Sequence, residues 1–125
     1  MRRLKTTEVA TVRAQLLVSQ GGRCALCSLP IGPSSDVLDH DHDTGAVRAT
    51  LHRGCNALLG KVENNHKRYG VVSLAAFANG VAGYLQAHST NRTGLLHPTH
   101  KTDDEKRLRR NKLARAARVR RAKES

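Results

Sequence analysis

Apolar residues recur at helical spacing close to the start of the chain. Thr6 and Thr7 can cap a helix there, and Gly21-Gly22 can end it. The apolar positions between these signals form one stripe: Val9, Val12, Leu16 and Leu17. The pattern predicts a first helix over residues 7–20 that packs this stripe against a core.

The middle of the chain changes to short runs that favour β-strands. Residues 37–42 and 46–51 are two such runs, and the tripeptide Asp43-Thr44-Gly45 joins them. Gly45 can adopt the positive φ that a tight turn needs. A helix is predicted to begin near Arg53, with Gly60 interrupting or ending it. The central pattern therefore predicts a β-hairpin followed by a helix.

A third helix is expected over residues 73–87, with Ser73 as its N-cap. Its apolar side is expected to belong to the core: Leu74, Phe77, Val81 and Leu85. Residues 88–100 have the composition of a linker. In the last segment, residues 103–123, the acidic residues come first and the basic residues last, which suits the dipole of a helix. We expect this segment to be either a helix that forms on DNA or a disordered arm. The expected division is a domain over residues 1–90 and a basic linker and tail over residues 91–125.

Positive charge is concentrated near the end of the chain. The protein has 22 Lys and Arg against 10 Asp and Glu, a net charge of +12. Residues 101–125 contain 11 basic and 4 acidic residues, so they carry +7 of the total and leave +5 for residues 1–100. This surplus favours a polyanionic partner, and nucleic acid is the default. A membrane surface is the weaker alternative, because no apolar face accompanies the charge.

Composition predicts a small core. With 125 residues the protein has room for one small domain and appendages, and such domains often need a metal or a disulfide. Tyr69, Phe77 and Tyr84 are its only aromatic residues. Three cysteines argue against a disulfide framework, and Met1-Arg2-Arg3 leads into a polar segment unlike a signal peptide. We therefore expect a protein that works in a reducing cytoplasm.

Two pairs of potential zinc ligands enclose the predicted hairpin. Cys24 and Cys27 form a C-x2-C pair, and after 24 further residues His52 and Cys55 form an H-x2-C pair. Three thiolates and one imidazole make a closed tetrahedral set, which indicates a structural Zn²⁺ site. Reduced core cysteines with a surface histidine are the alternative, and the paired spacing disfavours it. A closer alternative keeps the zinc but replaces His52 with another histidine.

Asp39-His40-Asp41-His42 lies between the zinc pairs, on the first predicted strand. Alternation places the two aspartates on one face and the two histidines on the other. Phosphodiester hydrolysis needs an activated water and a cation for the developing charge. His40 is a suitable general base, and Asp39 and the Asn56 amide are hard oxygen ligands for Mg²⁺. Each residue alone has an ordinary structural explanation, but their position between the zinc pairs favours a catalytic site.

This arrangement resembles the recombination endonuclease VII family of tailed phages, which belongs to the HNH or ββα-metal (His-Me finger) nucleases. The resemblance covers about residues 7–60 and rests on the string L-D-H-D-H-x-T-G-x-V-R, residues 38–48, between the zinc pairs. It implies an α+β fold, a small zinc-stapled ββα-metal domain with flanking helices. It also implies a DNA endonuclease that uses Mg²⁺ or Mn²⁺, cuts branched DNA such as Holliday junctions and leaves 5′-phosphate ends.

The resemblance assigns roles to four residues. It implies that Asp39 is the catalytic metal ligand, Asn56 the second ligand and His40 the general base. His42 matches a histidine that contacts the phosphate and steadies the transition state. Two positions depart from the best-known member, in which a zinc cysteine replaces His52 and a catalytic-site glutamate replaces Leu59.

Two further points of comparison with the best-known member concern the missing glutamate and the region used for dimerisation. Glu63, one turn after Leu59, is the nearest acid that could partly substitute for the missing glutamate. The best-known member dimerises through long helices after the zinc site, whereas here that region is short and contains Gly70, Gly80 and Gly83. Both a monomer and a homodimer are therefore compatible with the sequence.

The leading interpretation is a metal-dependent DNA endonuclease, either junction-resolving or nicking, that holds DNA through its basic surface and tail. The main alternative is a non-catalytic zinc-finger DNA-binding protein. Asp39, His40 and Asn56 argue against it, because without a cation an aspartate would repel the phosphate. An RNA-binding zinc protein is disfavoured by the scarcity of aromatic residues for base stacking. Arg48 is interpreted as a phosphate contact or as a solvated strand residue.

Overall fold

A computed structural model describes all 125 residues. They divide into two compact units, Met1–Ala82 and Gly83–Ser125. The fold is α+β, as predicted, with a two-stranded antiparallel hairpin followed directly by a helix. In chain order the elements are η1 (Thr6–Glu8), α1 (Val9–Ser19), β1 (Asp36–His40), β2 (Val47–His52), α2 (Arg53–Asn65), α3 (Leu74–Ala87) and α4 (Asp103–Glu124).

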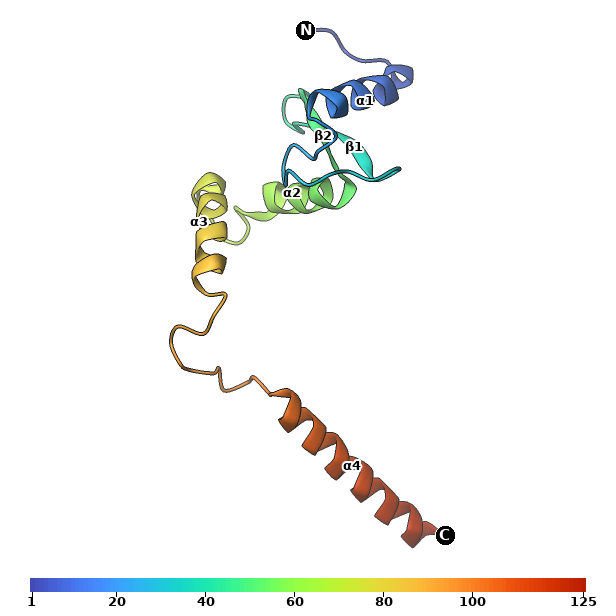
Figure 1. Ribbon diagram of the computed structural model, residues 1–125, viewed down its shortest axis with the longest axis vertical. Helices are drawn as coiled ribbons and strands as arrows, with labels where there is room; N and C mark the ends of the chain where they lie inside the picture. Colours follow the sequence, from blue (N-terminus) through green and yellow to red (C-terminus); the bar gives the residue numbers. More distant parts are fainter. The chain divides into compact units, whose positions relative to one another are not determined.

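The hairpin lies between two helices, with α1 on one side and α2 on the other (Figure 1). α1 follows a 3-10 turn and ends where Gly21 and Gly22 take φ values of 68° and 75°, which confirms the predicted stop. Its apolar stripe is half-buried against the hairpin. α2 continues through Gly60 to Asn65, so the prediction that this glycine interrupts or ends the helix is wrong. A single glycine costs a helix only about 1 kcal/mol, which flanking residues can offset.

The hairpin turn begins earlier than the sequence pattern predicts. β1 ends at His40, because the side chain of Asp41 accepts hydrogen bonds from the N–H groups of Asp43 (2.8 Å) and Thr44 (3.0 Å). These bonds, that from Thr44 first, lower the pKa of Asp41. Gly45 then takes φ 78°, as expected for the turn. Asp41 is therefore a turn residue rather than part of the strand.

The centre of the first unit is small and partly polar. Its buried apolar residues are Cys24 and Leu51, and its buried polar residues are Asp39 and Thr50. Gln20, at the end of α1, pairs with Thr50 in the manner of a neighbouring strand: its amide donates to the Thr50 carbonyl (2.8 Å) and accepts from the Thr50 N–H (2.9 Å). The Thr50 hydroxyl donates to the Arg13 carbonyl at 2.7 Å. These bonds fix the hairpin on α1.

The two C-terminal helices have little apolar burial. The Ser73 hydroxyl accepts from the Ala76 N–H at 3.1 Å, which confirms the predicted cap of α3. The prediction that the apolar side of α3 belongs to the core is wrong, because Phe77 and Leu85 are exposed and no residue of the helix is buried. α4 is capped by Thr102, with acids in its first turn and bases in its last. No helix combines the length and apolar character needed to cross a membrane.

Candidate functional site

The predicted zinc ligands lie together at one end of the hairpin. Cys24 and Cys27 belong to a tight turn in which the Ser28 N–H donates to the Cys24 carbonyl (2.9 Å). His52 is the last residue of β2 and Cys55 lies in the first turn of α2. The four ligand atoms lie within 4.8 Å of one another. Four ligands at ~2.3 Å from a tetrahedral Zn²⁺ are themselves ~3.8 Å apart, so the cluster fits this ion.

The His52 ring is oriented for ligation by hydrogen bonds on both sides. Its Nδ1 lies 3.2 Å from the sulfur of Cys27 and 3.8 Å from that of Cys55. Its Nε2 lies 2.8 Å from the Pro30 carbonyl, which can only accept, so the ring proton sits on Nε2 and Nδ1 faces the thiols. Such a second hydrogen bond is the usual way in which proteins fix a ligating histidine. His52, rather than another histidine, therefore completes the Cys3His set.

The cysteine thiols differ in acidity. Burial raises the pKa of Cys24, but the N–H groups of Cys27 and His52 that point at its sulfur outweigh this effect and lower the pKa to about 6. Burial and the neighbouring sulfurs of Cys27 and Cys24 raise the pKa of Cys55 to about 11. A cation that binds all four groups must therefore displace a proton from Cys55.

A second group of polar residues lines a depression of about 300 Å³ between the hairpin and α2. Three of the predicted site residues belong to it, namely Asp39, His42 and Asn56. Asp39 comes from β1 and is only 5% exposed, whereas Asn56 follows Cys55 on α2 and is half-buried. The zinc cluster therefore fixes the start of α2 and, with it, the distance between the amide and the carboxylate.

His40 occupies a different position from the other three residues. It is exposed, does not line the depression, and stacks on His42 with ring centroids 4.8 Å apart and planes inclined by 15°. Strand alternation does not explain this stack, because β1 ends at His40 and His42 belongs to the turn, from which it lines the depression together with Asp39. His40 therefore lies at the rim of the depression, next to Asp39 in the chain.

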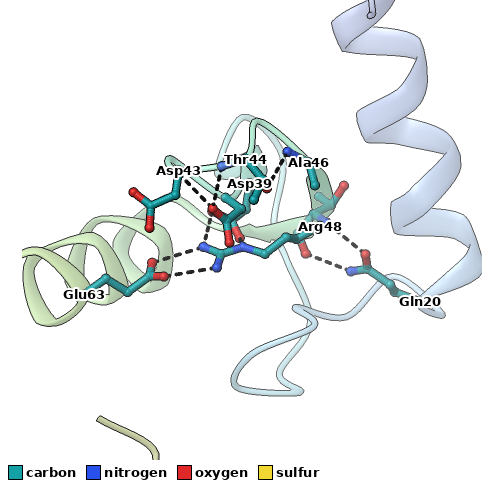
Figure 2. Close-up of polar contacts among 9 residues, drawn as sticks. Gln20, Asp39, Asp43, Thr44, Ala46, Arg48 and Glu63 are labelled. Carbon is teal, nitrogen blue, oxygen red and sulfur yellow. Dashed lines mark hydrogen bonds and ion pairs between the residues drawn. The ribbon is translucent and has the colours of Figure 1, made fainter. Parts of the chain in front are cut away.

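Arg48 bridges two carboxylates in the depression, which neither sequence interpretation of this residue anticipates. Its Nε lies 2.6 Å and its Nη2 3.2 Å from the two oxygens of Asp39. Its Nη1 and Nη2 each lie 3.1 Å from an oxygen of Glu63 on α2 (Figure 2). These bonds, those to Glu63 first, raise the pKa of Arg48. The guanidinium thus makes four hydrogen bonds to acids, although the side chain is still 33% exposed.

A β-bulge explains how Arg48 reaches Asp39. Asp39 is paired with Ala49 and His40 with Val47, so Arg48 has no partner on β1. An extra residue of this kind changes the direction of a side chain relative to the regular alternation. No feature of the sequence marks the bulge, and for this reason the Asp39–Arg48–Glu63 bridge is absent from the sequence prediction.

Comparison with known proteins identifies the family. A family model described as recombination endonuclease VII matches residues 1–113. The chain belongs to the recombination endonuclease VII family. The endonuclease VII match extends from the first residue to the first half of α4 and so exceeds the region of resemblance around the zinc pairs. Membership in this family implies a DNA endonuclease. No curated protein matches the chain at a significant level.

Proposed function

We propose that this protein hydrolyses phosphodiester bonds of DNA, either resolving branched DNA or nicking it, with one divalent cation held by Asp39 and Asn56. The observation that carries the proposal is that the Asp39 carboxylate, the Asn56 amide and the His42 ring line one depression beside the zinc cluster. The family supports DNA as the substrate. The Cys3His cluster supports a structural zinc, because its four closed positions leave none for a substrate.

The residues of the depression suit Mg²⁺ or Mn²⁺ at the proposed catalytic position. Asp39 and Asn56 offer one carboxylate and one amide oxygen, and hard cations of this size prefer oxygen ligands completed by water and phosphate. The depression is open to solvent, so a phosphate can approach these ligands. When bound, the cation stabilises charge that develops on the phosphate oxygens.

Two histidines supply the remaining chemistry in this proposal. His40 accepts a proton from the attacking water, since an exposed imidazole at the rim is free to exchange that proton with solvent. The ring of His42 lies under His40 and lines the depression, so it orients the base and contacts the phosphate. Asp39 and His40 are adjacent at the end of β1, so the cation and the base can flank one phosphate.

The basic C-terminal segment supplies non-specific affinity for DNA. α4 carries most of the +7 of residues 101–125, and none of its residues is buried, so no apolar side chain ties it to a core. Cations on such a helix neutralise phosphates and release counterions, irrespective of base sequence. The chain therefore combines a catalytic domain with an electrostatic arm.

A cleavage assay with matched histidine variants tests the proposal. Zinc-loaded protein is incubated with supercoiled plasmid, linear duplex and a four-way junction, each with Mg²⁺, Mn²⁺ or no added divalent cation. His40→Ala should reduce cleavage at least ~10²-fold and leave DNA binding unchanged. His88→Ala, which alters another exposed histidine far along the chain, is the control and should retain wild-type cleavage. DNA binding that needs no added divalent cation, without cleavage by the wild type under any condition, would instead favour the non-catalytic zinc-finger protein.

A further inference from the structure

The Asp39–Arg48–Glu63 bridge places a protein cation at the carboxylate that the proposed function assigns to a divalent cation. Both oxygens of Asp39 accept hydrogen bonds from Arg48, at 2.6 Å and 3.2 Å. The side chain of Asp39 is 7% exposed, whereas those of Arg48 and Glu63 are 33% and 34% exposed. The carboxylate is therefore the buried member, and the guanidinium is the member that has access to solvent.

The charges around the depression disfavour a divalent cation at Asp39 while the Arg48 guanidinium remains bound to the same carboxylate. Asp39 and Glu63 contribute two negative charges, and Arg48 and Lys61 contribute two positive charges to the same region. A divalent cation at Asp39 would add two further positive charges beside a guanidinium in direct contact with the same carboxylate. Like charges at such short separation are unfavourable, particularly where one partner is buried.

We propose that Arg48 is an internal counter-cation that competes with the divalent cation for Asp39, and that Glu63 controls this competition. This inference rests on the proposed function, because it needs a divalent cation at Asp39. In the cation-free protein Arg48 neutralises a buried carboxylate that would otherwise be costly to ionise. When the divalent cation binds, the guanidinium leaves Asp39 and remains on Glu63, with the freed N–H groups directed at the depression.

Glu63 makes this exchange possible by holding the second edge of the guanidinium. Its two oxygens accept from Nη1 and Nη2 of Arg48, both at 3.1 Å, so the arginine keeps one carboxylate after it gives up the other. Without Glu63, Arg48 would have Asp39 as its only acidic partner and would resist displacement. Glu63 is therefore a positioning residue that acts on the cation site through Arg48.

Binding of Mn²⁺ to the zinc-loaded full chain tests the inference directly. Mn²⁺ is a suitable probe because thiolate sites hold Zn²⁺ far more strongly, so the zinc cluster stays intact. The variants are Arg48→Met, which removes the charge but keeps the apolar stem, and Arg48→Lys, which keeps the charge and is the matched control. Glu63→Gln and Asp39→Asn complete the set. Free Mn²⁺ is measured by electron paramagnetic resonance, and zinc content and circular dichroism check the fold of each variant.

The variants should differ from wild type in their affinity for Mn²⁺ in a specific order. A neighbouring unit charge changes the proton affinity of a carboxylate by about one to three powers of ten, so Arg48→Met should tighten Mn²⁺ binding at least ~10-fold. Arg48→Lys should bind within about threefold of wild type, and Glu63→Gln should bind Mn²⁺ more weakly. Without Mn²⁺, Arg48→Met should also unfold at a lower temperature than wild type. Addition of Mn²⁺ should raise the unfolding temperature of the variant by more than that of wild type, because the ion then neutralises Asp39.

Two outcomes overturn the inference and are distinguishable. If Asp39→Asn abolishes Mn²⁺ binding but Arg48→Met leaves the affinity unchanged or weaker, Arg48 does not compete with the cation and the proposed function stands. If wild-type protein shows no Mn²⁺ binding that depends on Asp39, the proposed cation site and this inference fail together. Should Arg48→Met fail to fold even with Mn²⁺, the comparison of wild type with Glu63→Gln decides the question: weaker binding by the variant supports the inference, and equal affinities contradict it.

Discussion

Removal of one zinc ligand should unfold the first unit of this protein. Cys55→Ser replaces a thiolate with a hydroxyl that binds Zn²⁺ poorly, while the size of the side chain hardly changes. Cys24 and Leu51 are the only buried apolar residues. Cys24 is itself a zinc ligand, so only Leu51 counts as apolar core here, and full burial of such a side chain contributes about 1.5–3 kcal/mol. Structural Zn²⁺ contributes about 10–16 kcal/mol in small zinc domains, more than this core can replace.

Zinc content and secondary structure measure the effect together. Wild-type protein is expected to hold one zinc per chain, and Cys55→Ser should lose most of it together with the far-ultraviolet signal of the hairpin and α2. Leu58→Ala is the matched control, because Leu58 lies on the same helix and is 65% exposed. This control should keep its zinc and its fold.

Two results would refute the reasoning. The first is well-folded wild-type protein that contains no zinc by elemental analysis. The second is a Cys55→Ser variant that loses its zinc but unfolds in urea at the wild-type midpoint. Either result would mean that interactions other than metal ligation, such as the bonds between Gln20 and Thr50, hold the hairpin on α1.

Three further predictions concern the tail, the hairpin and the zinc thiols. Deletion of residues 101–125 should weaken binding to all DNA sequences alike and make the salt dependence of log K shallower, by about 0.9 for each phosphate that the tail no longer neutralises; unchanged binding would exclude an electrostatic arm. Gln20→Ala leaves the buried N–H of Thr50 without its partner at 2.9 Å and should cost about 1–3 kcal/mol in urea unfolding, unlike the exposed control Gln15→Ala. Because the pKa of Cys55 is raised to about 11, zinc binding releases a proton, and zinc affinity measured against a competing chelator should rise with pH; a flat profile would contradict this.

The elements that the sequence predicted well are those with a strong local signal. The Cys and His pairs at two-residue spacing identify a single cluster, because tight turns constrain where each pair can point. The Gly21-Gly22 stop and the Ser73 cap are likewise local, since each depends on the backbone conformation or hydrogen bond of one or two residues. The hairpin and the helix that follows it could be predicted from the alternation of residues along the strands, the turn at Gly45 and the positions of the zinc pairs.

The features that the sequence did not reveal depend on interactions between distant residues. The bulge at Arg48 exists because Asp39 pairs with Ala49 while His40 pairs with Val47, which no single-strand pattern records. The contact of Arg48 with Glu63 joins positions on different elements. α3 illustrates the opposite error: its apolar periodicity predicts a buried face, but the hairpin already lies between α1 and α2, and no sheet face is left for it to cover.

The zinc cluster also explains why a carboxylate can be buried at the centre of so small a domain. A core made only of apolar side chains would have to exclude Asp39, because an ionised carboxylate out of water is costly unless it is paired. A zinc ion in the Cys3His cluster would supply free energy of folding, so the interior could hold Asp39 and Thr50 beside two apolar residues. The cost of Asp39 is offset locally by Arg48, and a counter-ion with 33% exposure can be displaced. If Asp39 holds a second cation, as proposed, removal of zinc should abolish both the fold and the binding of that cation, whereas substitution of Asp39 should abolish only the binding.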